Sequence, residues 1–145
     1  MAKLGAFVAM YNDLMLAPSG LSKLEREMIA VAVSAHNRCY YCLVAHGASV
    51  RQLSGDPVLG ELMVMNYRGG APDAAQSAPC STSPSSSRAE PWLVEERIAT
   101  ACAARASAIA TSGTSRAVAS FFNMSNRMAF ATDMRPNSAY HAQAR

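Results

Sequence analysis

The stretch that decides the fold is Glu27-Met-Ile-Ala-Val-Ala-Val-Ser-Ala-His36-Asn-Arg-Cys39-Tyr-Tyr41-Cys42-Leu-Val-Ala-His46. On a helix that begins near Cys39, the spacings of three and four residues put Cys39, Cys42 and His46 on one face. The free amides and dipole of a helix start favour an anion, and a nearby imidazole can accept a proton, so we expect a thiolate near neutral pH. A thiolate beside a second thiol is a two-electron redox couple, and the stretch therefore predicts thiol redox chemistry.

The residues before this motif predict a second helix. Ser22-Lys-Leu-Glu25 is a capping-box pattern, in which the hydroxyl and the carboxylate each satisfy a free amide of the first turn. Glu27 lies at the edge of the apolar stripe on this helix. A carboxylate near a core is normally paired, protonated or functional, so we expect it to pair with His46 and form a proton relay to a thiol. The stripe consists of Leu24, Met28, Val31 and Ala35.

Together these residues resemble the alkylhydroperoxidase D-like (AhpD-like) branch of the carboxymuconolactone decarboxylase superfamily, in the subgroup called peroxidase-related enzymes. Its signature is Glu, an eleven-residue gap, Cys-x-x-Cys, three residues and His, which here reads Glu27, Cys39, Cys42 and His46. The resemblance implies that Cys42 attacks a hydroperoxide, that Cys39 resolves the product as a disulfide, and that Glu27 and His46 move the proton. It also implies a thiol reductant protein. Tyr41 departs from the pattern, because some members carry histidine there.

Several alternatives remain open at this stage. His36 and His46 could complete a zinc site with the two cysteines in a non-enzymatic or redox-sensing module, although structural zinc motifs usually sit on turns. The cysteines could be ordinary core residues, since buried cysteines are common. The same superfamily also includes lactone decarboxylases, whose acid–base chemistry would not need thiols. We expect no cofactor and no bound metal.

Composition limits the remaining classes of function. The chain has 145 residues, half of them apolar, and a formal charge of +3, which fits one domain and is no nucleic-acid signature. No apolar run of about eighteen residues predicts a membrane span, and the N-terminus is a poor signal peptide. We therefore expect a cytoplasmic protein, because a reducing compartment suits a cycling Cys-x-x-Cys pair.

The hydrophobic pattern predicts an all-α chain forming a single AhpD-like domain over residues 1–145. The cysteine helix should pack on the preceding antiparallel helix across a turn at 35–38. A domain this small needs partner subunits to cover its surfaces, so we expect a homo-oligomer. The predicted helices span residues 5–16, 22–35, 38–53, 57–67 and 117–129.

Residues 69–89 and 98–116 are atypical. The first stretch lacks large aliphatic and aromatic side chains, and the second is almost wholly Ala, Ser, Thr and Arg. Codons for both stretches, read in another frame, can encode amphipathic sequences of the family kind. We therefore interpret both as frame-shifted, which would make Cys80 and Cys102 artefacts; the alternative is a genuine disordered insert.

Overall fold

The computed structural model describes residues 2–67 and 108–145, and within these residues all of the regular secondary structure is helical. The prediction of an all-α fold is confirmed. The structure has α1 (Ala2–Leu16), α2 (Lys23–Asn37), α3 (Tyr40–Ser54), α4 (Pro57–Asn66), α8 (Ala108–Ala131) and α9 (Ser138–Ala142).

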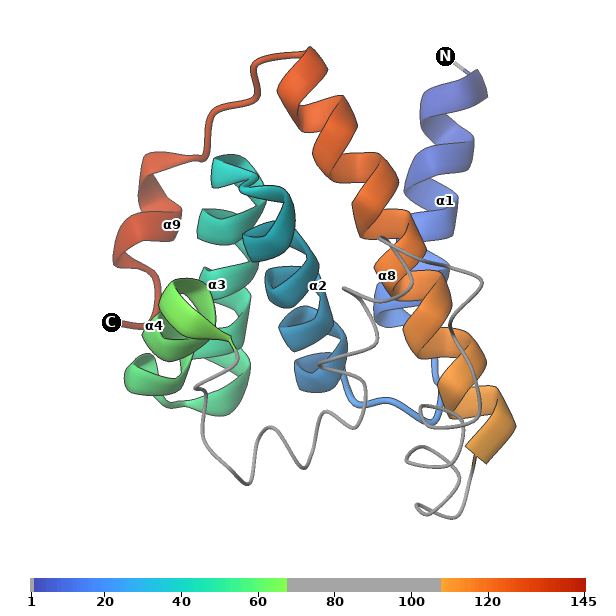
Figure 1. Cartoon of the computed structure of the whole chain (residues 1–145), viewed down its shortest axis with the longest axis horizontal. Helices are drawn as coiled ribbons and strands as arrows, with labels where there is room; N and C mark the ends of the chain where they lie inside the picture. Colours follow the sequence, from blue (N-terminus) through green and yellow to red (C-terminus); the bar gives the residue numbers. More distant parts are fainter. Residues whose placement is uncertain (1, 68–107) are drawn as a thin grey trace.

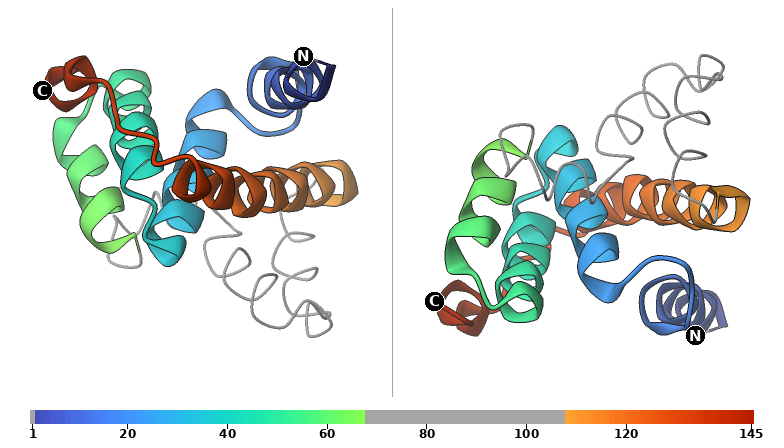
Figure 2. Two further views of the ribbon diagram at one scale, coloured as in Figure 1. Left: turned by 90° about the horizontal axis from the view of Figure 1, so that it is seen from above. Right: turned by 90° about the horizontal axis from the view of Figure 1, so that it is seen from below.

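Helix α2 lies at the centre of the fold (Figure 1). It packs against α3, α4, α8 and α1, and Figure 2 shows α1 and α8 on one side of it and α3, α4 and α9 on the other. Every residue from Arg26 to Ser34 is buried. The predicted apolar stripe was therefore too narrow, because a helix enclosed on all sides has no solvent face.

The start of α2 agrees with the sequence prediction, but its end does not. Ser22 is the N-cap, and both hydrogen bonds of the capping box with Glu25 are formed. The helix then continues to Asn37, two residues beyond its predicted end at Ala35, and ends with Arg38 in the left-handed conformation (φ 57°). The turn at 35–38 was wrong, since the chain reverses through Arg38 and Cys39 alone.

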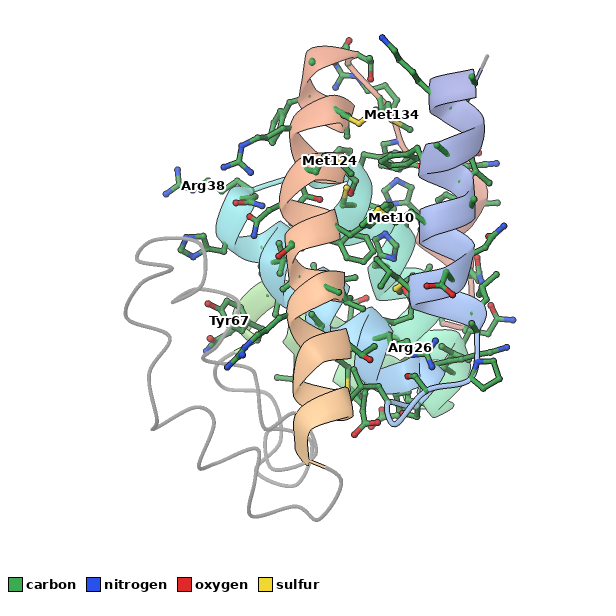
Figure 3. All side chains as sticks on the ribbon, turned by 90° about the vertical axis from the view of Figure 1, so that its right-hand side faces the viewer. Met10, Arg26, Arg38, Tyr67, Met124 and Met134 are labelled. Atoms are coloured by element: carbon green, nitrogen blue, oxygen red, sulfur yellow. The ribbon has the colours of Figure 1, made fainter. Side chains whose placement is uncertain are left out.

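A buried arginine joins α1 to α2. Arg26 is 2% exposed, and its guanidinium donates to the carbonyls of Leu14 and Leu21 and to Ser19 Oγ. Figure 3 shows it beside the loop that connects the two helices. Because a guanidinium has several N–H donors, this one side chain can hydrogen-bond several acceptors in and beside the loop. These bonds fix how α1 lies against the core.

Helices α3 and α4 approach closely at two glycines. A Cβ placed on Gly60 would lie 2.2 Å from Arg51 Cγ, and one placed on Gly47 would lie 2.7 Å from Val64 Cγ2. Both positions therefore require glycine for the packing that the structure has.

Arg51, the arginine that lies against Gly60, also anchors the C-terminus. Arg51 is 4% exposed, and it donates to the carbonyl oxygens of Gln143 (2.9 Å) and Tyr140 (2.8 Å). These bonds hold α9 against α3, so that Tyr140 reaches the region of the cysteine motif. Helix α9 was not predicted from the sequence.

Helix α8 is longer than the predicted helix 117–129, because it begins at Ala108 and ends at Ala131. Residues 108–116 contain one large apolar side chain, Ile109, so the extension carries no apolar stripe from which the sequence could predict a helix. Residues 69–89 and 98–107, on which most of the frame-shift interpretation rests, lie outside the described residues. Over 2–67 and 108–145, no helix is both long and apolar enough to cross a membrane.

Candidate active site

The Cys-x-x-Cys pair lies at the start of α3, where the sequence predicted it. Cys39 is the N-cap, and its N–H donates to the Ser34 carbonyl of α2 at 2.9 Å. Cys42 lies in the first turn. The two Sγ atoms are 2.9 Å apart, whereas a disulfide bond is about 2.05 Å long, so the pair is a dithiol here. Both cysteines are buried, at 2% and 3% exposure.

The environment of Cys42 differs from the predicted one. Burial raises the pKa of its thiol above the ordinary value, and the neighbouring Cys39 raises it further. A hydrogen bond from Ser34 acts in the opposite direction and lowers this pKa. For Cys42 this direction runs against the expectation of a thiolate near neutral pH, because burial favours the neutral thiol.

Glu27 and His46 form a buried pair between α2 and α3. His46 Nδ1 donates to Glu27 Oε2 at 2.6 Å, and both side chains are about one-tenth exposed. The edge of the imidazole packs against the Phe122 ring, with centroids 4.6 Å apart. The carboxylate fixes the orientation of the ring and leaves Nε2 as the nitrogen available for proton exchange.

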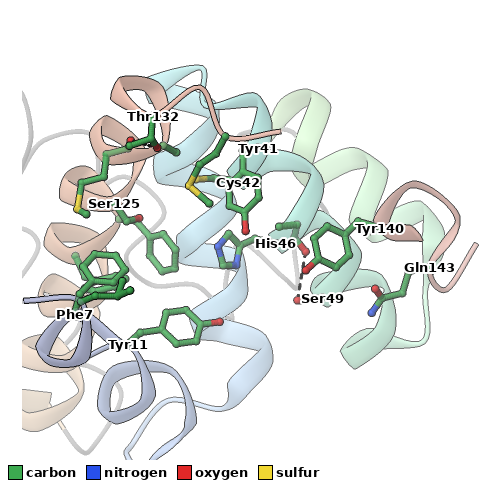
Figure 4. Close-up of a pocket in the computed structure, with 17 residues that line it drawn as sticks. Phe7, Tyr11, Tyr41, Cys42, His46, Ser49, Ser125, Thr132, Tyr140 and Gln143 are labelled. Atoms are coloured by element: carbon green, nitrogen blue, oxygen red, sulfur yellow. Dashed lines mark hydrogen bonds between the residues drawn. The ribbon is translucent and has the colours of Figure 1, made fainter. Parts of the chain in front are cut away.

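A cavity of about 500 Å³ opens beside this pair, within the range typical of small-molecule sites. Cys42 and His46 both line it, whereas Cys39 does not. Most of its wall is apolar or aromatic, with rings from α1 and α8 as well as α3. In Figure 4 the Tyr11, Tyr41 and Tyr140 side chains are arranged around His46.

These tyrosines and Ser34 are site residues that the sequence did not indicate as such. Burial, followed by the charge of Glu27, raises the pKa of Tyr11 to about 12. Burial also raises the pKa of Tyr41, with Tyr140 as the next cause. The Tyr11 and Tyr41 hydroxyls therefore stay protonated at neutral pH and can donate hydrogen bonds into the cavity. They come from helices far apart in sequence, and no local spacing links them.

The zinc alternative requires His36 and His46 to join the two cysteines. Among residues 2–67 and 108–145, no group of three or more His, Cys, Asp or Glu side chains is placed to hold a metal ion. His46 instead uses Nδ1 for Glu27. The described part of the chain does not assemble the four-ligand set.

Comparison with known proteins adds to this geometry. Residues 3–58 match the carboxymuconolactone decarboxylase family. A peroxidase-related protein from Silicibacter sp. TM1040 shares 51% identity and superposes with a TM-score of 0.92, over 99% of this chain and 75% of that one. A protein from Ralstonia eutropha JMP134, described as an alkylhydroperoxidase AhpD core and peroxidase-related, shares 33% identity with a TM-score of 0.91, over the same shares of the two chains. No curated protein matches the sequence.

The fold and the motif define an AhpD-like helical protein. The chain belongs to the carboxymuconolactone decarboxylase family, and its solved relatives are peroxidase-related proteins.

Proposed function

We propose that this protein is a thiol peroxidase that reduces hydroperoxides through Cys42 and Cys39. The observation that carries the proposal is the dithiol with one sulfur on the wall of an apolar cavity, next to a His46–Glu27 pair. Relatives described as peroxidase-related support the same class of activity. A dithiol supplies the two electrons that cleavage of an O–O bond requires.

In the proposed reaction, the Cys42 thiolate attacks the terminal oxygen of a hydroperoxide, the O–O bond breaks, and the alkoxide takes up a proton as an alcohol. The resulting sulfenic acid is attacked by Cys39, which forms the disulfide and releases water. One hydroperoxide and two thiols thus become one alcohol, one water and one disulfide. A thiol reductant then restores the dithiol.

Glu27 and His46 act as the proton relay in this scheme. The raised pKa of Cys42 makes a base necessary, because the thiol is protonated in the resting state. The imidazole accepts the thiol proton, and the Glu27 carboxylate stabilises the imidazolium that forms. The same proton can then pass to the leaving alkoxide.

The test is turnover of an organic hydroperoxide with a chemical dithiol as reductant. Cys42→Ser is expected to reduce turnover to background while circular dichroism shows unchanged helix content. Cys39→Ser serves as the matched control, because it removes a thiol from the same helix turn but keeps the attacking one. When no dithiol is added, this variant should still consume one hydroperoxide per chain and then stop, because Cys39 is no longer present to resolve the sulfenic acid.

Turnover retained by Cys42→Ser would contradict the assignment. If the protein without substitutions kept an enzymatic activity after complete alkylation of its thiols, that result would favour the acid–base chemistry of the decarboxylases instead.

A further inference from the structure

The two sulfurs of the motif border two different pockets. Cys42 lines the 500 Å³ cavity, whereas Cys39 lines a separate pocket of about 90 Å³ between the start of α3 and the end of α8. Tyr41, Ala129 and Met134 line both pockets and so form the wall between them. Access to one sulfur is therefore separated from access to the other.

The smaller pocket differs from the cavity in size and rim. At about 90 Å³ it is well below the usual range for small-molecule sites and admits only the end of a slender chain. Tyr40 and Phe130 are more than half exposed at its rim. Asp133 and Arg135 add an exposed ion pair, with N–O 2.9 Å.

We propose that the Cys39–Cys42 disulfide is reduced through this smaller pocket, by a thiol on a slender chain that attacks Cys39 Sγ. The inference rests on the proposed function, which supplies the disulfide. Exchange requires the attacking thiolate to reach one sulfur, so accessibility decides which of the two reacts. Cys39 lines the smaller pocket and Cys42 does not, so a thiol in that pocket approaches Cys39.

The reaction balances as ordinary thiol–disulfide exchange. The incoming thiolate bonds to Cys39 Sγ, the Cys39–Cys42 bond breaks, and Cys42 leaves with the bonding electrons and takes up a proton, as its raised pKa favours. A second thiol attacks the mixed disulfide, releasing the oxidised reductant and Cys39. This direction returns Cys42 as the free cysteine that attacks the next hydroperoxide, while the substrate cavity stays free for the hydroperoxide.

The experiment traps the mixed disulfide. Every protein carries Cys80→Ser and Cys102→Ser, so that Cys39 and Cys42 are its only thiols. The disulfide is formed with a chemical thiol oxidant rather than a peroxide, and glutathione is added with an alkylating agent that caps the released thiol. Peptide mapping should find glutathione on Cys39 and the alkyl group on Cys42, in about tenfold excess or more over the reverse. Glutathione mainly on Cys42 would overturn the proposal.

Two exposed truncations provide a kinetic test. Phe130→Ala widens only the smaller pocket and Leu4→Ala widens only the cavity, and both side chains are about 60% exposed. Phe130→Ala should speed reduction by glutathione several-fold and leave oxidation by hydroperoxide unchanged. Leu4→Ala should leave reduction unchanged. Faster reduction of Leu4→Ala alone would contradict the proposal.

The source of the thiol is resolved by repeating the trap with an unstructured peptide that bears one cysteine. Faster reaction than with glutathione indicates a thiol on a protein segment, and slower reaction indicates a free small thiol. Because the disulfide is made chemically, a protein inert to hydroperoxides could still take glutathione at Cys39. That result would contradict the peroxidase assignment alone. If the protein instead reduced hydroperoxides normally but took glutathione at Cys42, only the proposed route of disulfide reduction would be contradicted.

Discussion

Cys42 gives up its proton with difficulty, because its thiol is buried against Cys39. Ser34 acts in the opposite direction, since its hydrogen bond stabilises the thiolate. Ser34 is itself fully buried, and its hydroxyl lies 3.3 Å from Asn126 Oδ1 of α8, so its one hydrogen serves either that oxygen or Cys42. A serine in the middle of the central helix thus links the cysteine motif to a helix that is distant in sequence. We infer that it is a positioning residue for the attacking sulfur.

Ser34→Ala should lower the reactivity of Cys42. A hydrogen bond to a charged group is worth about 1.5–3 kcal/mol, so its loss reduces the thiolate fraction at neutral pH by about tenfold or more. The measurement is the rate of Cys42 alkylation against pH, resolved by peptide mapping. Since the pKa of Cys42 is raised, the rate should keep rising with pH beyond the ordinary thiol range, and the variant's curve should lie further toward high pH.

Ser49→Ala is the matched control, because Ser49 also lines the cavity but is not among the groups that shift the pKa of Cys42. Identical alkylation profiles for Ser34→Ala and the unmodified protein would remove Ser34 from the site.

At this scale the sequence was informative where spacing alone decides the geometry. The sequence itself sets the intervals between Cys39, Cys42 and His46. The Glu27–His46 contact follows when the two helices that carry Glu27 and His46 pack together. Burial of Cys42 could not be predicted in the same way. It depends on α8, whose Ala129 forms one buried cluster with the two cysteines from the other end of the chain.

At the scale of the elements, the helix starts were more predictable than the helix ends. Ser22 and Asp56 cap their helices with side-chain acceptors that the sequence displays. The end of α2 instead depends on Arg38 adopting a left-handed conformation, which arginine rarely does and no local pattern indicates. Helix α9 was missed because the buried Arg51 holds it in place, and an arginine in a helix is normally read as exposed.

The α3–α4 contact gives a stability prediction. Gly60→Ala should destabilise the fold by up to about 2 kcal/mol, because an overpacking penalty of about 1–3 kcal/mol is offset by a gain of only roughly 1 kcal/mol in helix propensity. Arg51 cannot move away easily, since its guanidinium is bound to α9. The measurement is the free energy of unfolding in urea.

Gly5→Ala is the control, because a Cβ there meets nothing within 4 Å. It should stabilise the protein by up to about 1 kcal/mol through propensity alone. If Gly60→Ala were equally stabilising, the close approach of α3 and α4 would be wrong.

At the scale of the whole molecule, helices from both ends of the chain enclose one cavity beside α2. Helix α1 contributes Phe7 and Tyr11, α8 contributes Phe121 and Phe122, and these rings form a single apolar cluster with the buried face of α2. Such closure is a property of the tertiary fold, so the sequence predicted the reactive groups but not the cavity.

The prediction of a homo-oligomer stays a prediction. Helix α1 exposes the apolar side chains of Leu4, Val8 and Leu16 on its surface, where a second copy of the chain could cover them.

The frame-shift interpretation also belongs to this scale. Resequencing the coding DNA across codons 69–117 should reveal compensating insertions or deletions at the ends of the two atypical stretches. An unchanged DNA sequence would mean that the insert is genuine and that Cys80 and Cys102 are native cysteines.

The central claim is that Cys39 and Cys42 act together as the two-electron donor to a hydroperoxide. The most direct measurement is to mix the reduced protein, with Cys80→Ser and Cys102→Ser, with one equivalent of an organic hydroperoxide and analyse it by thiol titration and mass spectrometry. The account predicts that both thiols disappear in step with one equivalent of alcohol formed, and that a Cys39–Cys42 disulfide is the product. Alcohol formed while both thiols persist, or thiols lost as separate sulfinic acids without a disulfide, would contradict it.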